Sequence, residues 1–185
     1  MKFQPTPLQG SYLIDVIKLE DSRGFFSRAF SVEDFEKKGL ETHFVQFNNS
    51  LSHKKGTLRG MHYQLPPSSE VKLVRCIRGS LYDVILDLRE NSPTFGKSFG
   101  AKLSADNRRM MYVPKGFAHG FLTLTDDAEV FYAVSNTYDN ELERGIRWND
   151  PTFQIEWPFE PVVLSDRDLQ HPDYNPSYHL NQANS

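Results

Sequence analysis

Five side chains that can carry or transfer charge lie in runs that alternate between apolar and polar residues: Arg59, His62, Lys72, His119 and Tyr132. Such alternation predicts β-strands, and a polar residue among the apolar residues of a strand costs free energy unless it has a partner or a function. One histidine in a sheet is more often a packing residue than a catalyst. Five such groups would need five unrelated partners, so the packing interpretation is weaker for the set than for one histidine, and we regard them as candidates for a functional site.

The alternation also predicts which way individual side chains point. Tyr132 has the parity of Val130 and Val134, so we expect its side chain on the core side of its strand. Asp83 and Asp87 have the opposite parity from the apolar residues of SLYDVILDL, which places them on the other face of that sheet. There they would form a hydrogen-bonding or solvated surface, or would orient a cation or a histidine if that face lines a cavity.

Two local features decide whether the cationic residues between positions 56 and 76 meet. His62 and Lys72 come close if the strands on either side of QLPPSS pair as a hairpin. Strict alternation puts Arg59 and His62 on opposite faces, so a shared pocket requires an irregular strand, and Gly60 between them is the position where a bulge would form. Arg75 has the opposite parity from Lys72 and no predicted role.

Short β-rich runs recur along the chain and are separated by turn residues. They are YLIDVIKL, GFFSRAF, FVQFNN, TLRGMHY, VKLVRCI, SLYDVILDL, KSFGAKL, RMMYVP, HGFLTLT and AEVFYAVSN. This pattern predicts an all-β protein, a β-sandwich or jelly roll with a few short helices. Neither a repeat nor a linker divides the sequence, so we expect residues 1–185 to form one domain.

Two short helices and a polar tail complete the expected architecture. SVEDFEKKG has Ser31 as a helix N-cap and Gly39 as a stop, and SDRDLQ, which begins at Ser165, is expected to form a further helical turn. The tail, residues 171–185, is polar and is expected to be loosely ordered.

The composition excludes several classes of protein. The 185 residues include 21 Lys and Arg against 24 Asp and Glu, and the net charge of −3 gives no basic surface for nucleic acid. The single cysteine, Cys76, excludes an internal disulfide and a multi-cysteine zinc site, and its apolar neighbours predict a core position. The sequence has neither a signal-peptide pattern nor a membrane-length apolar run, so we expect a cytoplasmic protein that binds a small ligand or another protein.

The two strand histidines invite comparison with the metal site of cupins, a superfamily of β-sandwich proteins. Gly56 precedes His62 at the spacing of the first cupin motif, and PKGFAH, residues 114–119, fits the second motif. However, Gln64 replaces the second histidine of the first motif, and Glu70 comes later than the motif requires. Because an amide is a poor ligand for a transition metal, we expect no bound metal and histidines that are free to act as acids or bases.

Over most of its length the sequence resembles one family, the dTDP-4-dehydrorhamnose 3,5-epimerases. The stretches that carry the resemblance, between about residues 5 and 170, are DSRGFF, QFNNS, GTLRGMHYQ, EVKLVRCIRGSLYDVILDLR, SPTFG, LSADN, VPKGFAHGF, EVFYAVSNTY, ERGIRWNDP and LSDRD. The resemblance implies a cupin fold and an isomerase without metal or cofactor. Its implied reaction is the epimerisation of a dTDP-4-keto-6-deoxyhexose at C3 and C5, which yields dTDP-4-dehydro-L-rhamnose for cell-surface polysaccharide.

The resemblance also implies roles for individual residues. His62 would be the base, oriented by Asp168, while Tyr132 would be the acid on the opposite face of the sugar and Lys72 would lie beside the C4 carbonyl. The implied contacts to substrate and nucleotide are Arg23, Phe26, Gln46, Asn48, Arg59, His119, Tyr138, Glu143 and Arg167. The family forms dimers in which the N-terminal strand region of one subunit completes the site of the other, so Arg23 and Phe26 are expected to serve the neighbouring pocket.

One departure from the family pattern keeps other readings open. Arg28 stands where the family has a glutamate, so a donor replaces an acceptor near the sugar or nucleotide. An enzyme that inverts only C3 or only C5 of a related sugar nucleotide is therefore an alternative. A metal-dependent cupin enzyme and a non-catalytic cupin that binds sugar nucleotides are two further alternatives.

Overall fold

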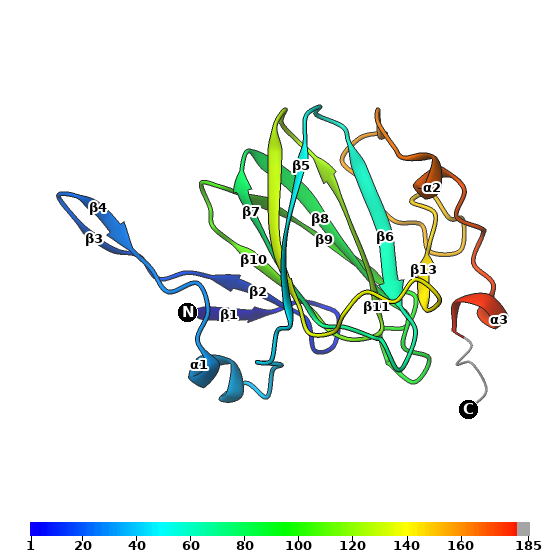
Figure 1. Ribbon diagram of the computed structural model, residues 1–185, viewed down its shortest axis with the longest axis horizontal. Helices are drawn as coiled ribbons and strands as arrows, with labels where there is room; N and C mark the ends of the chain where they lie inside the picture. The colour runs from blue at the N-terminus through cyan, green and yellow to red at the C-terminus, as the bar shows by residue number, and fades with distance from the viewer. Residues whose placement is uncertain (181–185) are drawn as a thin grey trace.

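Two antiparallel sheets lie face to face in the computed structural model, which describes residues 1–180 (Figure 1). The larger sheet contains, in spatial order, β1 (Lys2–Pro5), β2 (Tyr12–Asp15), β10 (Met110–Val113), β7 (Lys72–Arg78), β12 (Ala128–Val134) and β5 (Gln46–Ser52). The smaller sheet contains β13 (Glu143–Gly145), β6 (Leu58–Gln64), β11 (Phe117–Thr123), β8 (Ser80–Asp87) and β9 (Ser98–Ser104). The predicted all-β sandwich is confirmed.

The space between the sheets is filled by the apolar residues of each strand that share one parity. Val74, Cys76 and Val130 from the larger sheet pack against Leu81 and Ile85 from the smaller one, and all five are fully buried. Burying an aliphatic side chain of this size contributes about 1.5–3 kcal/mol, so this layer supplies much of the stability of the sandwich. The predicted core position of Cys76 is confirmed.

The smaller sheet is covered on both faces, which changes the expected surroundings of its aspartates. The even-numbered residues Val84 and Leu86 pack in an outer cluster with Ile146, while Asp83 and Asp87 point to the inside of the sandwich and are fully buried. The prediction that both aspartates lie on the opposite face of β8 from Val84 and Leu86 was correct. The alternative that this face is a solvated surface was wrong. Both aspartates take the other role that we considered, because Asp83 contacts a histidine and Asp87 binds a cation.

The helices agree with the capping residues in the sequence. Helix α1 (Val32–Glu36) begins after Ser31, whose hydroxyl accepts the backbone N–H of Asp34, and α2 (Asp166–Leu169) begins after Ser165, which does the same for Asp168. Each cap satisfies a backbone donor that the helix leaves free. Within residues 1–180, no helix is long and apolar enough to cross a membrane.

The last described residues are better ordered than a polar tail predicts. A third helix, α3 (Pro176–His179), begins with a proline after its N-cap Asn175, and its residue His179 is completely buried. The hydroxyl of Tyr63 donates a hydrogen bond of 3.0 Å to the carbonyl of His179. The expectation of a loosely ordered tail therefore does not describe residues 171–180, and residues 181–185 lie outside the described part.

The two strands on either side of QLPPSS do not form the predicted hairpin. Strand β6 belongs to the smaller sheet and β7 to the larger one, so the connection crosses from one sheet to the other. His62 and Lys72 nevertheless come together, because Lys72 Nζ lies 3.4 Å from the carbonyl oxygen of His62. The proximity was predicted correctly from a wrong pairing, and it arises across the sandwich instead of within one sheet.

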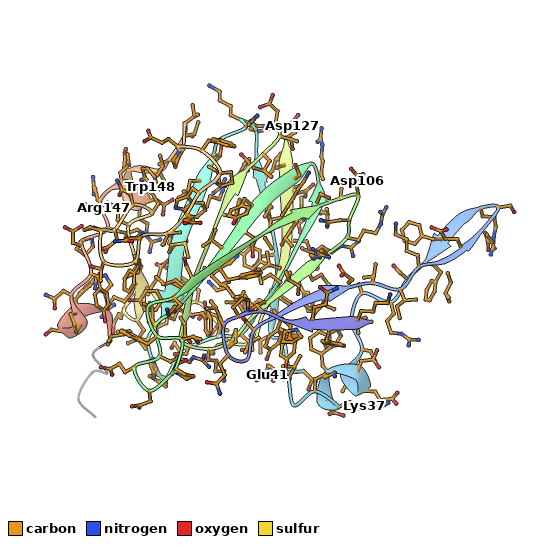
Figure 2. All side chains as sticks on the ribbon, turned by 180° about the vertical axis from the view of Figure 1, so that it is seen from behind. Lys37, Glu41, Asp106, Asp127, Arg147 and Trp148 are labelled. Atoms are coloured by element: carbon orange, nitrogen blue, oxygen red, sulfur yellow. The ribbon has the colours of Figure 1, made fainter. Side chains whose placement is uncertain are left out.

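A separate two-stranded hairpin projects from the sandwich. Its strands β3 (Leu19–Asp21) and β4 (Gly24–Phe26) extend away from both large sheets (Figure 1). Seen from behind, the hairpin extends beyond the two large sheets (Figure 2), although the guanidinium of Arg108 lies over the Phe25 ring, 4.4 Å from its centroid. Phe26 is 64% exposed, and large apolar side chains on an isolated arm indicate a surface for another molecule.

Strand β6 is irregular at Gly60, as the shared pocket of Arg59 and His62 requires. His62 lies opposite His119 while Arg59 lies opposite Phe121, so three steps along β6 match two steps along β11. Gly60 has φ +117°, and a Cβ there would lie 2.6 Å from the Cα of Gly120. Only glycine fits at this bulge, which turns the side chains of Arg59 and His62 toward the same cavity.

We predict that Gly60→Ala lowers the free energy of unfolding by about 2–3 kcal/mol, because the new methyl group meets the backbone of β11. Gly39→Ala is the matched control, since Gly39 also has a positive φ but has no described atom within 4 Å of the place that the new methyl group would occupy. The control substitution is expected to cost about 1 kcal/mol. Urea denaturation at one fixed protein concentration measures both values, and equal losses would contradict the packing argument.

Candidate active site

A cavity with two adjoining compartments, of about 300 and 230 Å³, opens between the two sheets. His62, Lys72 and Tyr132 line both compartments. The first compartment is also lined by Ser50, Arg59, His119, Phe121, Val130, Ser165, Arg167 and Asp168, and the second by Gln46, Asn48, Tyr63, Gln64, Glu70, Val134, Asn136, Tyr138 and Glu143. Except for two residues on the projecting hairpin, every predicted site residue lines this cavity.

His62 is held by a buried carboxylate. Its Nε2 lies 2.6 Å from Asp168 Oδ1, and Asp168 is only 3% exposed. Burial alone would raise the pKa of Asp168, but contacts from His171 and His62 outweigh burial and keep that pKa well below its usual range. Asp168 is therefore an ionised acceptor, so Nε2 of His62 carries the proton and Nδ1 is the nitrogen that can accept one.

The two principal influences on the His62 ring oppose each other. Burial lowers the pKa of His62 because it disfavours the charged imidazolium, while the hydrogen bond and the charge of Asp168 raise it. Burial is the larger effect, so the pKa lies below 6.5. The ring is therefore neutral near pH 7 and is available as a base, while Asp168 stabilises the imidazolium once a proton has been accepted.

Tyr132 extends from β12 in the larger sheet, on the other side of the cavity from His62. Burial raises the pKa of Tyr132, although the nearby charge of Arg59 opposes the rise. The phenol is protonated at neutral pH as a result, which is the state that a proton donor needs. Its predicted orientation toward the core side of the strand is confirmed, because it packs with the residues between the sheets.

Lys72 lies in a network that fixes its position. Its Nζ is 3.1 Å from Glu70 Oε1, and both side chains are largely buried. Gln64 Nε2 donates to the other oxygen of Glu70 at 2.7 Å, and Gln64 Oε1 accepts the backbone N–H of Asp139 at 2.5 Å. An ammonium group held in this way in a partly dry cavity presents a positive charge without further rearrangement.

The residues that would form a cupin metal site do not gather around a common point. His62 contacts Asp168, and His119 Nε2 lies 2.8 Å from Asp83 Oδ1. Glu70 binds Lys72, and the amide of Gln64 is occupied by the network just described. Each potential ligand has another partner, so these residues do not fit a cupin metal.

Two arginines and a second histidine also line the first compartment. Arg59 donates from Nε to Ser52 Oγ and from Nη2 to the carbonyl of Leu51, both at 3.2 Å, while its side chain still lines the cavity. His119 and Arg167 lie in the same compartment. Three groups that can donate to phosphate oxygens therefore surround one space.

The rim of the second compartment is closed by side chains from two separate segments. Tyr138 Oη donates to Glu143 Oε2 at 2.6 Å, and Arg167 of α2 forms an ion pair with the same carboxylate. Gln46 and Asn48 of β5 line the opposite wall. An aromatic ring, a carboxylate and two amides suit a planar, polar ligand such as a nucleobase.

Arg23 and Phe26 are not part of this cavity. Both belong to the β3–β4 hairpin, and the guanidinium of Arg23 binds Asp21 of the same hairpin at 2.6 Å. The hairpin points away from the sandwich (Figure 1). Their expected service to the pocket of a neighbouring subunit remains a prediction.

His171 is a residue near His62 that sequence reasoning missed. Its Nε2 lies 3.5 Å from Asp168 Oδ1, and its ring packs directly over Gly145. It lies in the segment expected to be loosely ordered, so its sequence position gave no signal. Ser50, Phe121, Asn136 and Ser165 also line the cavity and were not predicted individually.

Comparison with known proteins gives a consistent result. A family model described as dTDP-4-dehydrorhamnose 3,5-epimerase matches residues 5–175. The dTDP-4-dehydrorhamnose 3,5-epimerase of Shigella flexneri is 50% identical over 150 residues, which are 80% of this chain and 82% of the relative. The crystal structure of the Elizabethkingia anophelis enzyme of that name is 43% identical, with a TM-score of 0.90 over 94% of this chain and 96% of the other.

One solved structure contains a ligand that bears on the site. The dTDP-6-deoxy-D-glucose-3,5-epimerase of Legionella pneumophila was crystallised with dTDP-4-keto-L-rhamnose. It is 37% identical, with a TM-score of 0.85 over 94% of this chain and 98% of the other. The fold that surrounds the cavity is therefore shared with a protein that binds a keto-sugar nucleotide.

We predict that Asp168→Asn moves the pKa of His62 further below 6.5, because the substitution removes the charge that stabilises the imidazolium. The measurement is the pH titration of the His62 Cε1–H resonance by NMR. Asp127→Asn is the control, since Asp127 contacts only the exposed ring of His53 and Arg78 among the described cations. An unchanged or raised His62 pKa in Asp168→Asn would show that Asp168 does not stabilise the charged ring.

Proposed function

This chain belongs to the dTDP-4-dehydrorhamnose 3,5-epimerase family, and we propose how its residues perform the reaction of that family. The enzyme is an isomerase that converts dTDP-4-dehydro-6-deoxy-D-glucose to dTDP-4-dehydro-L-rhamnose by inverting C3 and C5. Each inversion removes a proton next to the C4 ketone from one face and returns a proton from the other face.

The observation that carries the assignment of roles is that the two proton-transfer groups come from different sheets. His62 comes from β6 of the smaller sheet and Tyr132 from β12 of the larger sheet, and both line the same cavity. A sugar bound between the sheets has a base on one face and an acid on the other. A single base without an opposed acid would return the proton to the face that it left.

His62 acts as the base through Nδ1. Its Nε2–H is bound to Asp168, which fixes the tautomer and the ring orientation. When Nδ1 accepts the proton from C3 or C5, the ring becomes an imidazolium next to an ionised carboxylate. General base catalysis of this kind contributes about 10²–10⁴ in rate.

Lys72 stabilises the enolate that proton removal creates. The ketone at C4 acidifies the neighbouring C–H bonds by placing the negative charge on its oxygen, and an ammonium group beside that oxygen lowers the energy of the intermediate. Glu70 and Gln64 hold Lys72 in place before the substrate arrives. Charge stabilisation by prepositioned groups is usually the largest catalytic term.

Tyr132 supplies the second proton. Its raised pKa keeps the phenol protonated until the carbanion forms, and the phenolate then recovers a proton from solvent. Because the proton that Tyr132 gives to the opposite face of each carbon comes from solvent, deuterated solvent marks each inverted centre. The chemistry uses the side chains of the chain itself and requires no cofactor.

The remaining cavity residues bind the nucleotide. Arg59, His119 and Arg167 are suited to the diphosphate, because charged donors form short, strong hydrogen bonds to phosphate oxygens. Gln46, Asn48, Tyr138 and Glu143 line the second compartment and are assigned to thymine and deoxyribose. The cationic end of the cavity also compensates for the negative charges of the substrate.

We also propose that the chain forms a homodimer in the cytoplasm. The outer face of the larger sheet carries Phe47 and Phe131, whose rings stack with their centroids 5.9 Å apart, and Phe47 is 64% exposed. An exposed aromatic pair beside a projecting hairpin is suited to bind a second copy. In such a dimer Arg23 and Phe26 would reach the partner's cavity.

The reaction is tested with dTDP-4-keto-6-deoxyglucose in D2O, followed by NMR at C3 and C5. We expect deuterium at both carbons together with the L-rhamno product. Label at one carbon would restrict the activity to a single epimerisation. No label with this or other keto-sugar nucleotides would exclude the proposed chemistry.

Two variants in the same assay separate the roles of base and acid. His62→Ala should lower exchange by about 10²–10⁴ while the affinity for dTDP stays nearly unchanged. Tyr132→Phe should retain exchange through His62 but lose inversion. A large loss of dTDP binding in His62→Ala would instead assign His62 a structural role, and His53→Ala at an exposed histidine is the control.

The dimer is tested with Phe47→Glu, which places a charge in the exposed aromatic pair on the outer face of the larger sheet. We expect sedimentation velocity to show a dimer for the unmodified chain and a shift to monomer for the variant, because a buried unpaired charge destabilises an interface. Val162→Glu is the control, since Val162 is 73% exposed away from that face. A dimer that tolerates Phe47→Glu as well as the control would place the interface elsewhere.

A further inference from the structure

Behind the base, the structure gathers a second histidine that the proposed reaction does not use. His62, Asp168 and His171 each offer one ligand atom, and the three atoms lie within 4.8 Å of one another. The side chains are mostly buried, with exposed fractions of 30%, 5% and 11%. Two imidazoles and a carboxylate are a common ligand set for zinc and similar ions.

The spacing of these groups is close to that of a tetrahedral metal site. Metal–nitrogen bonds of about 2.0–2.1 Å imply ligand atoms about 3.3 Å apart and imidazole centroids about 5 Å apart. Asp168 Oδ1 lies 2.6 Å from His62 Nε2 and 3.5 Å from His171 Nε2, and the ring centroids are 5.6 Å apart. Small side-chain movements would therefore place one ion among the three.

His171 is prepared for a ligand in one further respect. Its Nε2 is buried and has no hydrogen-bond partner among the described residues, and its 3.5 Å separation from Asp168 is long for a hydrogen bond. A buried polar nitrogen without a partner costs free energy. Coordination to an ion would satisfy it.

We propose that His62, Asp168 and His171 bind a divalent transition-metal ion such as Zn²⁺ and that the bound ion inhibits the enzyme. The inhibition rests on the proposed function, in which His62 is the base. The metal site itself does not depend on that assignment.

Coordination would remove the basic nitrogen of His62 without displacing the substrate. A neutral imidazole has one N–H, which His62 now carries on Nε2 toward Asp168. If Nε2 binds the ion, the proton moves to Nδ1. Nδ1 then has no free lone pair with which to accept a proton from C3 or C5.

The ligand set itself includes a negative charge. Lys72 is paired with Glu70 and Arg167 with Glu143, while Arg59 donates to Ser52 Oγ and to the carbonyl of Leu51. Asp168 supplies the negative charge that a divalent ion between the two imidazoles would contact directly.

The ion also has a route that avoids the substrate cavity. A separate cavity of about 490 Å³ lies on the far side of the Arg167–Glu143 pair and is lined by His171, Gly145 and Gln170 among others. His171 therefore borders this second cavity while its Nε2 faces Asp168. This site differs from the metal site of cupins, since of these ligands it shares only His62.

The test uses tag-free, metal-free full-length protein titrated with Zn²⁺ by calorimetry and with Co²⁺ by visible absorption. We expect one strong site per chain, a Co²⁺ spectrum typical of low coordination number, and loss of epimerisation that EDTA reverses. His171→Phe keeps a ring over Gly145 but removes the ligand. It should weaken Zn²⁺ binding by at least tenfold and lose the Co²⁺ spectrum.

His53→Phe is the matched control, because it removes an exposed histidine that pairs with Asp127, at the upper edge of the molecule in Figure 2. The inhibition of each variant is expressed relative to its own metal-free rate. Zn²⁺ held by the diphosphate of the substrate would inhibit all variants to the same extent. Equal binding and inhibition in His171→Phe and the unmodified chain would overturn the proposal. Full occupancy by Zn²⁺ without inhibition would also overturn the proposal. If the chain is inactive toward keto sugars, Zn²⁺ calorimetry and Co²⁺ absorption alone decide whether the metal site exists.

Discussion

Asp168 is an ionised carboxylate in a largely buried position, and the arrangement of His62 follows from how the charge of Asp168 is stabilised. The carboxylate belongs to α2, whose position is set by the segment that returns from the smaller sheet, and Ser165 caps that helix. Contacts from His62 and His171 compensate for the loss of water. Since an ionised carboxylate only accepts hydrogen bonds, the tautomer of His62 is determined by Asp168. The free Nδ1 is a consequence of that buried charge.

The opposite wall is organised by a different principle. Lys72 has Glu70 as its partner, and Glu70 is held in turn by Gln64, the residue that breaks the cupin metal motif. In a cupin metal site the position of Gln64 would hold an ion. Here it fixes a carboxylate that binds the ammonium group of Lys72, so the protein places a positive charge in the cavity where a metal-binding cupin would place an ion.

Local sequence rules predicted the parts of the site that depend on one strand. The parity of Tyr132, the helical turn that begins at Ser165 and the bulge at Gly60 each follow from neighbours within a few residues. The wrong β6–β7 hairpin and the solvated surface proposed for Asp83 both concern which elements lie across from a strand. His171 was missed for the same reason, because its order depends on packing over Gly145 and not on its own segment.

The division of the site between two sheets explains why its chemistry was easier to predict than its geometry. Residue types indicate acids, bases and cations without reference to partners, while opposed faces exist only after the sheets have packed. The bulge at Gly60 is required because His62 must turn toward the larger sheet while Arg59, three residues earlier, faces the same cavity. A regular strand could supply either the base or the phosphate contact to that cavity. In the proposed mechanism, inversion at two carbons of a charged nucleotide sugar needs both, so one glycine couples the fold to that mechanism.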